Sequence, residues 1–321
     1  MNPLKKVAYS AINQCLLKPL SLLNSLHYEN ANTIVISGYP RGGTTWLSEV
    51  MSTIPRSHVL WEPLHLGNNP TCKEYGFDWS NFCHPENNQP RWEEYMQKLI
   101  AGRELTCSTL TRLNLKPMRL FSPQTLILKF VNGNLLMPWM AERLPIRPII
   151  LLRHPCAVVA SQLKHGSWDQ LTNLAPQDAI RLSPAVVKAF PFVETVYGKL
   201  STFEEALAFS WAIKTIVPLY FQSEKILLTH YESLVDTPEI EIPRIFKHLG
   251  RAIPNSFYEQ LKNPSRSTRA SSNFAKRGDA LSGWQQTLDP KQIHQILNIA
   301  QEMKVSIYDE SLLPNGAKVS W

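Results

Sequence analysis

Short apolar runs alternate along the chain with longer segments of helical periodicity. The runs are rich in β-branched residues and end at polar or glycine positions, which is typical of strands buried on both faces. The expected strands are Thr33–Ser37, Ser57–Trp61, Thr125–Phe130, Pro148–Leu152 and Lys225–Thr229. The expected helices are Thr44–Met51, Arg91–Ala101, Met137–Arg143, Pro155–Lys164, Thr202–Phe221, Pro238–Leu249 and Pro290–Met303. This alternation predicts an α/β fold, with a central parallel sheet flanked by helices.

The alternation is interrupted twice, which predicts a single domain over 31–321 with insertions at about 64–120 and 166–200. A helical segment over 1–30 precedes it, with Lys5, Lys6 and Lys18 among many leucines. We expect this segment to be an amphipathic helix packed on the domain rather than a membrane-surface anchor. Because no apolar stretch reaches the roughly 18–20 residues of a spanning helix, the default expectation is a cytoplasmic protein.

The first expected strand leads into a glycine-rich turn, Gly38-Tyr-Pro-Arg-Gly-Gly43, and a helix opens at Thr44 or Thr45. Glycines let the backbone approach a ligand, and the unpaired amides of a first helical turn attract anions. The spacing follows the P-loop pattern, so we expect a P-loop-like sheet. Thr44 occupies the lysine position, however, and Arg41 is the only cation in the turn.

Charge points to the same kind of ligand. The net charge is +7 and the pI about 9.1, which favours nucleotides, nucleic acid, acidic glycans or a membrane surface. Two strongly apolar expected strands end in cations, Lys129 and Arg153, at positions where a metal-dependent phosphate site needs carboxylates. The five cysteines lack metal-ligand spacing, so free thiols and no metal are expected.

Three further segments could meet an anion. Arg153-His-Pro155 ends a strand and is followed by Ser161; an arginine there would lie at the carboxyl edge of the sheet, where open α/β folds bind ligands. Tyr231 directly follows another strand, in Tyr231-Glu-Ser-Leu-Val235. The basic stretch Lys276-Arg277-Gly278 precedes Gly283-Trp284. Each segment alone is a weak signal.

Together with Tyr39-Pro-Arg-Gly-Gly-Thr-Thr-Trp46, these segments resemble, in the same order, the motifs of sulfotransferases that use 3′-phosphoadenosine 5′-phosphosulfate (PAPS). The resemblance spans about 33–303. It implies that Arg41 and the amides of Gly42, Gly43, Thr44 and Thr45 hold the 5′-phosphosulfate, and that Trp46 stacks on adenine. It implies that Arg153 and Ser161 bind the 3′-phosphate with Lys276, Arg277 and Gly278, and that Tyr231 contacts the base. The family needs no metal.

The chain departs from the cytosolic branch of that family. That branch has lysine and serine where Arg41 and Gly42 stand; arginine resembles the carbohydrate and tyrosylprotein branches. The cytosolic branch also has a histidine that acts as the general base shortly after its third strand. This chain has Lys129-Phe-Val-Asn132 at that place, without a histidine. The resemblance therefore favours Glu62, beside Trp61, as the general base. His58 and His65 are the alternatives, and Lys129 resembles a lysine that supports the bridging oxygen of the leaving group.

The prediction is a PAPS-dependent sulfotransferase acting on an acceptor hydroxyl by in-line displacement. We expect the acceptor to be a carbohydrate, a glycolipid or a small metabolite, and not nucleic acid. The aromatic stretch 75–82 is expected to line the acceptor site. Two alternatives stay open: a P-loop nucleotide kinase or NTPase, and a non-catalytic nucleotide- or glycan-binding protein.

Overall fold

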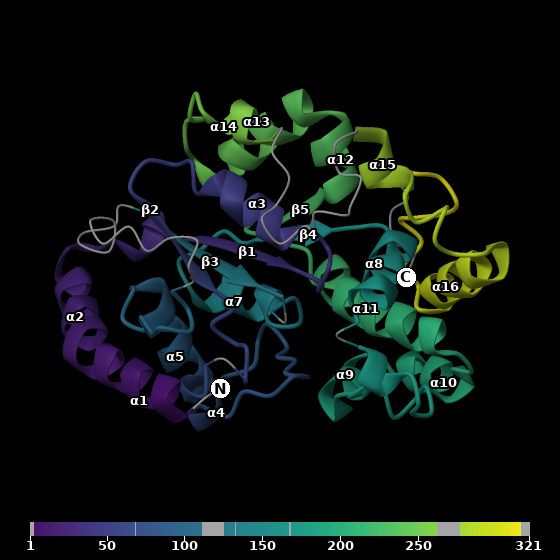
Figure 1. Ribbon diagram of the computed structural model, residues 1–321, viewed down its shortest axis with the longest axis horizontal. Helices are drawn as coiled ribbons and strands as arrows, with labels where there is room; N and C mark the ends of the chain where they lie inside the picture. The colour runs from purple at the N-terminus through teal and green to yellow at the C-terminus, as the bar shows by residue number, and fades with distance from the viewer. Residues whose placement is uncertain are drawn as a thin grey trace.

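A single parallel sheet with helices on both faces forms the centre of the molecule (Figure 1). The computed structural model describes residues 3–67, 69–110, 125–131, 133–166, 168–261 and 277–315. The strands are β1 (Ile34–Gly38), β2 (Ser57–Trp61), β3 (Thr125–Phe130), β4 (Ile149–Leu152) and β5 (Leu227–His230). Their order is β2-β3-β1-β4-β5, and every neighbouring pair is parallel. The predicted α/β fold, with a P-loop-like unit of β1, glycine turn and α3, is confirmed.

The helices match the predicted ones to within two residues at either end. Those that were predicted are α3 (Thr44–Met51), α5 (Pro90–Ile100), α7 (Met137–Arg143), α8 (Pro155–His165), α11 (Phe203–Tyr220), α13 (Pro238–Leu249) and α16 (Pro290–Glu302). Shorter helices lie between them: α4 (Thr71–Glu74), α9 (Pro184–Ala189), α10 (Phe192–Lys199), α12 (Tyr231–Asp236), α14 (Phe257–Leu261) and α15 (Arg277–Ser282). Helices α4 and α5 lie within the first expected insertion, and α9 and α10 within the second; the domain boundaries themselves stay a prediction.

Each central strand is buried on both faces, and its alternate side chains enter two different cores. In β1, Val35 joins the core that contains α5, α7, α8 and α11, whereas Ile34 and Ile36 join the core under α3, α13 and α14. In β4, Ile150 and Ile149 divide in the same way. Figure 1 shows these two groups of helices on opposite sides of the sheet. The continuous apolar runs of the sequence arise from this two-sided burial.

The parallel register brings the carboxyl ends of the strands to one edge. Gly38 pairs with Leu151, Trp61 with Lys129 and Leu152 with His230. The residues that follow these positions, including Arg41, Glu62 and Arg153, therefore emerge along a common edge.

The N-terminal segment is helical, through α1 (Pro3–Ile12), a π-helical stretch (Asn13–Leu17) and α2 (Lys18–His27). Leu17 and Leu20 are buried against the domain, and Asn13 Oδ1 accepts a hydrogen bond from the Cys107 amide at 2.8 Å. The segment thus packs on the domain, as predicted. In the part of the chain that is described, no helix combines the length and apolarity needed to cross a bilayer. All five cysteines are free.

Candidate active site

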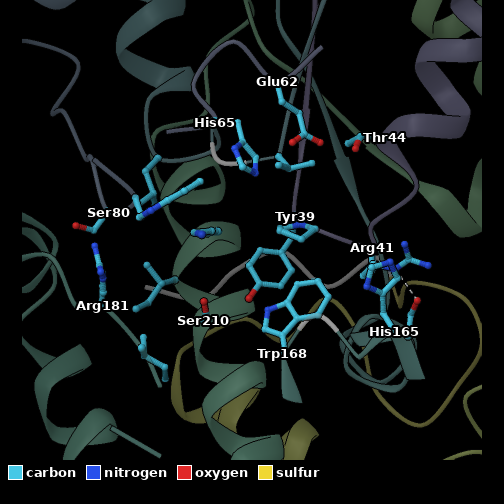
Figure 2. Close-up of a pocket in the computed structure, with 18 of the residues that line it drawn as sticks. Tyr39, Arg41, Thr44, Glu62, His65, Ser80, His165, Trp168, Arg181 and Ser210 are labelled. Atoms are coloured by element: carbon cyan, nitrogen blue, oxygen red, sulfur yellow. Dashed lines mark hydrogen bonds between the residues drawn. The ribbon is translucent and has the colours of Figure 1, made fainter. Parts of the chain in front are cut away.

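A cavity of about 1110 Å³ opens at the carboxyl edge of the sheet. Single-ligand pockets measure roughly 300–1,000 Å³, so this cavity has room for a nucleotide and a second ligand. Figure 2 shows it as a trough: Arg41 and His165 lie at one end, Ser80 and Arg181 at the other, with Tyr39 between them. We call the end at Arg41 the donor end and the end at Arg181 the acceptor end.

The glycine turn forms the wall of the donor end. Gly43 caps α3 with φ 93°, and an added Cβ would lie 2.6 Å from Cδ2 of Tyr231. The first helical hydrogen bond runs from the Leu47 amide to the Gly43 carbonyl at 3.1 Å. The amides of Thr44 and Thr45 precede this bond and have no acceptor inside the helix, which suits an anion.

Arg41 is held across the donor end in the left-handed conformation, with φ 70°. Its Nε donates to Ser161 Oγ on α8 at 3.0 Å, and its carbonyl accepts from Arg153 Nη1 at 3.0 Å. Three residues from two separate sequence motifs therefore meet at the donor end. A non-glycine residue in this region costs free energy, and such strain concentrates at functional sites.

Arg153 leaves the end of β4 and lies over the ring of Tyr231, with Cζ 4.2 Å from the ring centroid. It also donates from Nη2 to the Ala280 carbonyl of α15 at 3.4 Å. Its Nε and the Tyr231 hydroxyl are buried without a hydrogen-bond partner among the described residues. Burial raises the pKa of the Tyr231 hydroxyl, so it stays a neutral donor. Two orphaned polar groups beside a glycine cradle are what an absent polar ligand would satisfy.

The predicted clamp is only partly described. Lys276 lies outside the described residues, and Arg277 and Gly278 begin α15. Because Arg153 contacts that helix through Ala280, the clamp segment adjoins the Arg153 motif. The ring of Trp46 meets Tyr231 edge-on at 5.5 Å and lines the cavity. The adenine, phosphate and clamp roles stay predictions.

A buried hydrogen-bond network that the sequence did not reveal holds His154, the residue that follows Arg153. The His154 amide donates to Glu232 Oε1 at 2.9 Å, and the Tyr308 hydroxyl donates to Glu232 Oε2 at 2.9 Å. His154 Nδ1 accepts from the Cys156 amide, and its Nε2 donates to the Asp309 carbonyl at 2.8 Å. Trp284 stacks on the imidazole at 4.6 Å. Burial lowers the pKa of His154 to about 4, so the ring is neutral and its tautomer is fixed.

Glu62 and Lys129 form an ion pair at the centre of the trough. Lys129 Nζ lies 2.5 Å from Glu62 Oε1 and 4.0 Å from the ring centroid of Trp61. The Glu62 amide donates to the Lys129 carbonyl at 2.8 Å, and Glu62 has φ 44°. Lys129 is 1% exposed; burial lowers its pKa, Glu62 opposes that shift, and Arg41 adds to it. The contact joins the ends of adjacent strands β2 and β3.

The two histidine alternatives for the base differ in position. His58 is buried within β2 and does not line the cavity, so it cannot meet a substrate there. His65 lines the cavity and packs edge-on against Trp79 at 5.0 Å. Glu62 also lines the cavity, where it contacts Lys129. Glu62 and His65 can therefore both meet a substrate there, and the choice of Glu62 as the base stays a prediction.

The acceptor end is lined by residues that sequence reasoning mostly missed. Of the aromatic stretch 75–82, Trp79 and Ser80 line the cavity, but Phe77 and Phe82 are buried in the core, so that prediction was wrong for most of the stretch. The second insertion adds Arg181, and α11 adds Ser210. Lys214 lines the cavity too, and Trp168 packs edge-on against His165 with ring centroids 5.7 Å apart, toward the donor end. No sequence motif marks these positions, because they come from three separate segments.

Among the described residues, no group of three or more histidine, cysteine or carboxylate side chains has the arrangement of a metal site.

The model of the sulfotransferase domain family matches residues 31–306. Among solved structures, the chain is similar to a mouse sulfotransferase complexed with PAP (16% identity, 90% of this chain and 89% of that chain, TM-score 0.44). It is also similar to a sulfotransferase domain of a Synechococcus olefin synthase (16% identity, 87% and 96% covered, TM-score 0.46). No curated protein matches the sequence. Because the family model covers most of the chain, this protein belongs to the sulfotransferase domain family.

Proposed function

We propose that the protein transfers the sulfuryl group of PAPS to a hydroxyl of a carbohydrate, glycolipid or small metabolite. The observation that carries the proposal is the Glu62–Lys129 pair, which lies in the same cavity as the glycine turn and Arg41. An anion site, a carboxylate and a buried cation are the groups that in-line displacement requires. Family membership supports the reaction class, and PAP in a structural relative agrees with the choice of donor.

The donor end fits a nucleotide with phosphates at both ends. Arg41 and the amides of Thr44 and Thr45 would take the 5′-phosphosulfate, and Arg153 with Ser161 the 3′-phosphate. Arg41 and Ser161 now hold each other at 3.0 Å, so the incoming phosphates replace a contact that the two side chains make themselves. The Tyr231 hydroxyl and Arg153 Nε gain partners in the same step.

Glu62 would remove the proton as the acceptor oxygen attacks sulfur. The new bond joins that oxygen to sulfur, and the bond between sulfur and the bridging phosphate oxygen breaks. The bisphosphate leaves with the electron pair, next to Lys129 and Arg41. Lys129 Nζ holds Oε1 of Glu62, so Oε2 is the oxygen that would accept the proton.

The test is transfer of label from ³⁵S-PAPS to a panel of glycans, glycolipids, phenols and peptides. We expect a labelled product whose formation persists in EDTA. Mg²⁺-dependent transfer of phosphate from ATP, with no ³⁵S label on any acceptor, would favour the kinase alternative. Tight binding of the 3′,5′-bisphosphate with no labelled product on the whole panel would favour a non-catalytic binding protein.

A further inference from the structure

The peptide group that joins Arg153 to His154 is held on both sides by buried side chains. Its carbonyl accepts from Trp211 Nε1 of α11 at 3.1 Å, and its amide donates to Glu232 Oε1 of α12 at 2.9 Å. Trp211 is 1% exposed and Glu232 is 2% exposed, so water does not compete for these bonds. Because the plane of this peptide group fixes a backbone torsion of Arg153, both contacts act on the direction in which the arginine leaves β4.

Glu232 is a carboxylate in an interior position, where an ionisable group is costly unless its hydrogen bonds are satisfied. Its second oxygen accepts from the Tyr308 hydroxyl at 2.9 Å, and that hydroxyl also bonds His230 Nδ1 at 2.8 Å. Burial raises the pKa of the Glu232 carboxyl, while the His154 amide and the charge of Arg153 oppose that shift. Both carboxyl oxygens are thus occupied by partners that hold the residue in one orientation.

The residue before Glu232 holds the other end of Arg153. The guanidinium Cζ lies 4.2 Å from the centroid of the Tyr231 ring, and this tyrosine is 1% exposed. Two consecutive residues of α12 therefore hold Arg153, one at its backbone and one at its charged group. Among the described residues, Arg153 Nε has no hydrogen-bond partner, so these contacts orient the arginine and still leave a donor for a ligand.

The chain that follows α16 completes this arrangement. The Asp309 carbonyl accepts from His154 Nε2 at 2.8 Å. The Tyr308 ring meets the His154 ring edge-on at 5.1 Å and packs against Trp211 at 6.2 Å. Side chains from α11, α12 and the C-terminal part of the chain therefore converge on a single peptide group at the end of β4. Such convergence is typical of a supporting shell that fixes a binding residue.

Resting on the proposed function, in which Arg153 meets the 3′-phosphate of the donor, we propose that Glu232 is a positioning residue for that contact. Glu232 does not touch the donor. It fixes the peptide group between Arg153 and His154, so that the guanidinium over Tyr231 meets the phosphate without first having to be ordered. Loss of Glu232 frees this peptide group to rotate and releases the arginine, while the loop amides that take the 5′ end stay in place.

The experiment measures by calorimetry how the full chain and its variants bind PAP and adenosine 5′-phosphate, which lacks the 3′-phosphate. For Glu232→Leu we expect the affinity for PAP to fall about tenfold or more, with little change for adenosine 5′-phosphate. Glu232→Gln should bind PAP nearly as the wild type does, because the amide oxygen still accepts from the His154 amide and the NH₂ group can donate to the Tyr308 hydroxyl.

Three further variants separate positioning from a general loss of stability. Tyr308→Phe removes one partner of Glu232 and should give a smaller loss of the same selectivity; it carries the test if Glu232→Leu does not fold. In an Arg153→Met background, Glu232→Leu should cost no further affinity for PAP, since the two act through one contact. The control is Glu241→Leu, a buried carboxylate of α13 that bonds Thr229 and Arg244. It should lower the thermal unfolding temperature and leave the ratio of the two affinities unchanged.

Two results would overturn the inference alone: a wild-type preference for PAP that survives in Glu232→Leu, or an equal loss of both nucleotides in that variant. An additional loss in the Arg153→Met background would likewise show that Glu232 does not act through Arg153. A wild-type protein that binds PAP no better than adenosine 5′-phosphate would overturn the proposed donor contact itself, and the role of Glu232 with it.

Discussion

The two ends of the trough are built in different ways. The donor end consists of backbone amides, strand termini and side chains that hold one another, such as Arg41 with Ser161 and Arg153 with Tyr231. The acceptor end consists of side chains from two insertions and one helix, and several, including Arg181, are exposed. A backbone-built site tolerates little variation and recognises one ligand, whereas a side-chain-built site can change its ligand by substitution.

A substitution at Glu62, which lies between the two ends, should separate turnover from donor binding most clearly. Glu62→Gln removes the base but leaves the donor contacts, so we expect turnover to fall about 10²-fold or more while PAP affinity stays near the wild-type value. Steady-state transfer from PAPS and calorimetry with PAP measure the two quantities. The control is Glu86→Gln, an exposed carboxylate of the first insertion. Wild-type turnover in Glu62→Gln would move the base to His65.

The sequence predicted the donor end in more detail than the acceptor end for a physical reason. Donor residues follow directly on recognisable strands, so their positions at the sheet edge could be inferred from the parallel fold. The ion pair of Glu62 and Lys129 was not predictable as a contact, because the strand order that makes β2 and β3 neighbours is not written in either segment.

The supporting groups were missed for a related reason. Glu232 and Tyr308 meet His154 from distant parts of the chain, and nothing local marks that contact. Lys214 lines the cavity from the middle of α11, and no motif in that segment marks it. The strained backbone at Arg41 and Glu62 gave no signal either, because neither position holds glycine.

The donor end can be tested through the two arginines that flank β4. Arg153→Met removes a charged fork beside the expected 3′-phosphate, and we expect PAP to bind about 10- to 100-fold more weakly. The matched control is Arg147→Met, at the opposite end of the strand, where the guanidinium donates to the His248 carbonyl. Calorimetry on both variants decides the question: equal affinities would show that the 3′-phosphate does not reach Arg153.

Glycine substitutions test whether the donor end depends on its backbone. Gly43→Ala adds a methyl group 2.6 Å from Tyr231 at φ 93°, so we expect a loss of about 1–3 kcal/mol in unfolding free energy, with weaker PAP binding. The control, Gly198→Ala, lies in α10 with nothing within 4 Å of the added atom. It should stabilise the protein by about 0.5–1 kcal/mol. Denaturant unfolding measures both, and the same sign of change in the two variants would contradict the argument.

The acceptor end should respond more weakly and only on the acceptor side. Trp79 is half-buried and lines the cavity from the first insertion, next to Ser80, so Trp79→Ala removes one stacking surface while the donor loop, Glu62 and Lys129 keep their contacts. A ring contact is worth about 0.5–1.5 kcal/mol, which corresponds to a rise of roughly two- to tenfold in the KM of the acceptor. The KM of PAPS should not change, nor should either value in Tyr258→Ala, an exposed aromatic residue of α14. If Trp79→Ala instead raised the KM of PAPS, the two ends would not be separable in the way their construction implies.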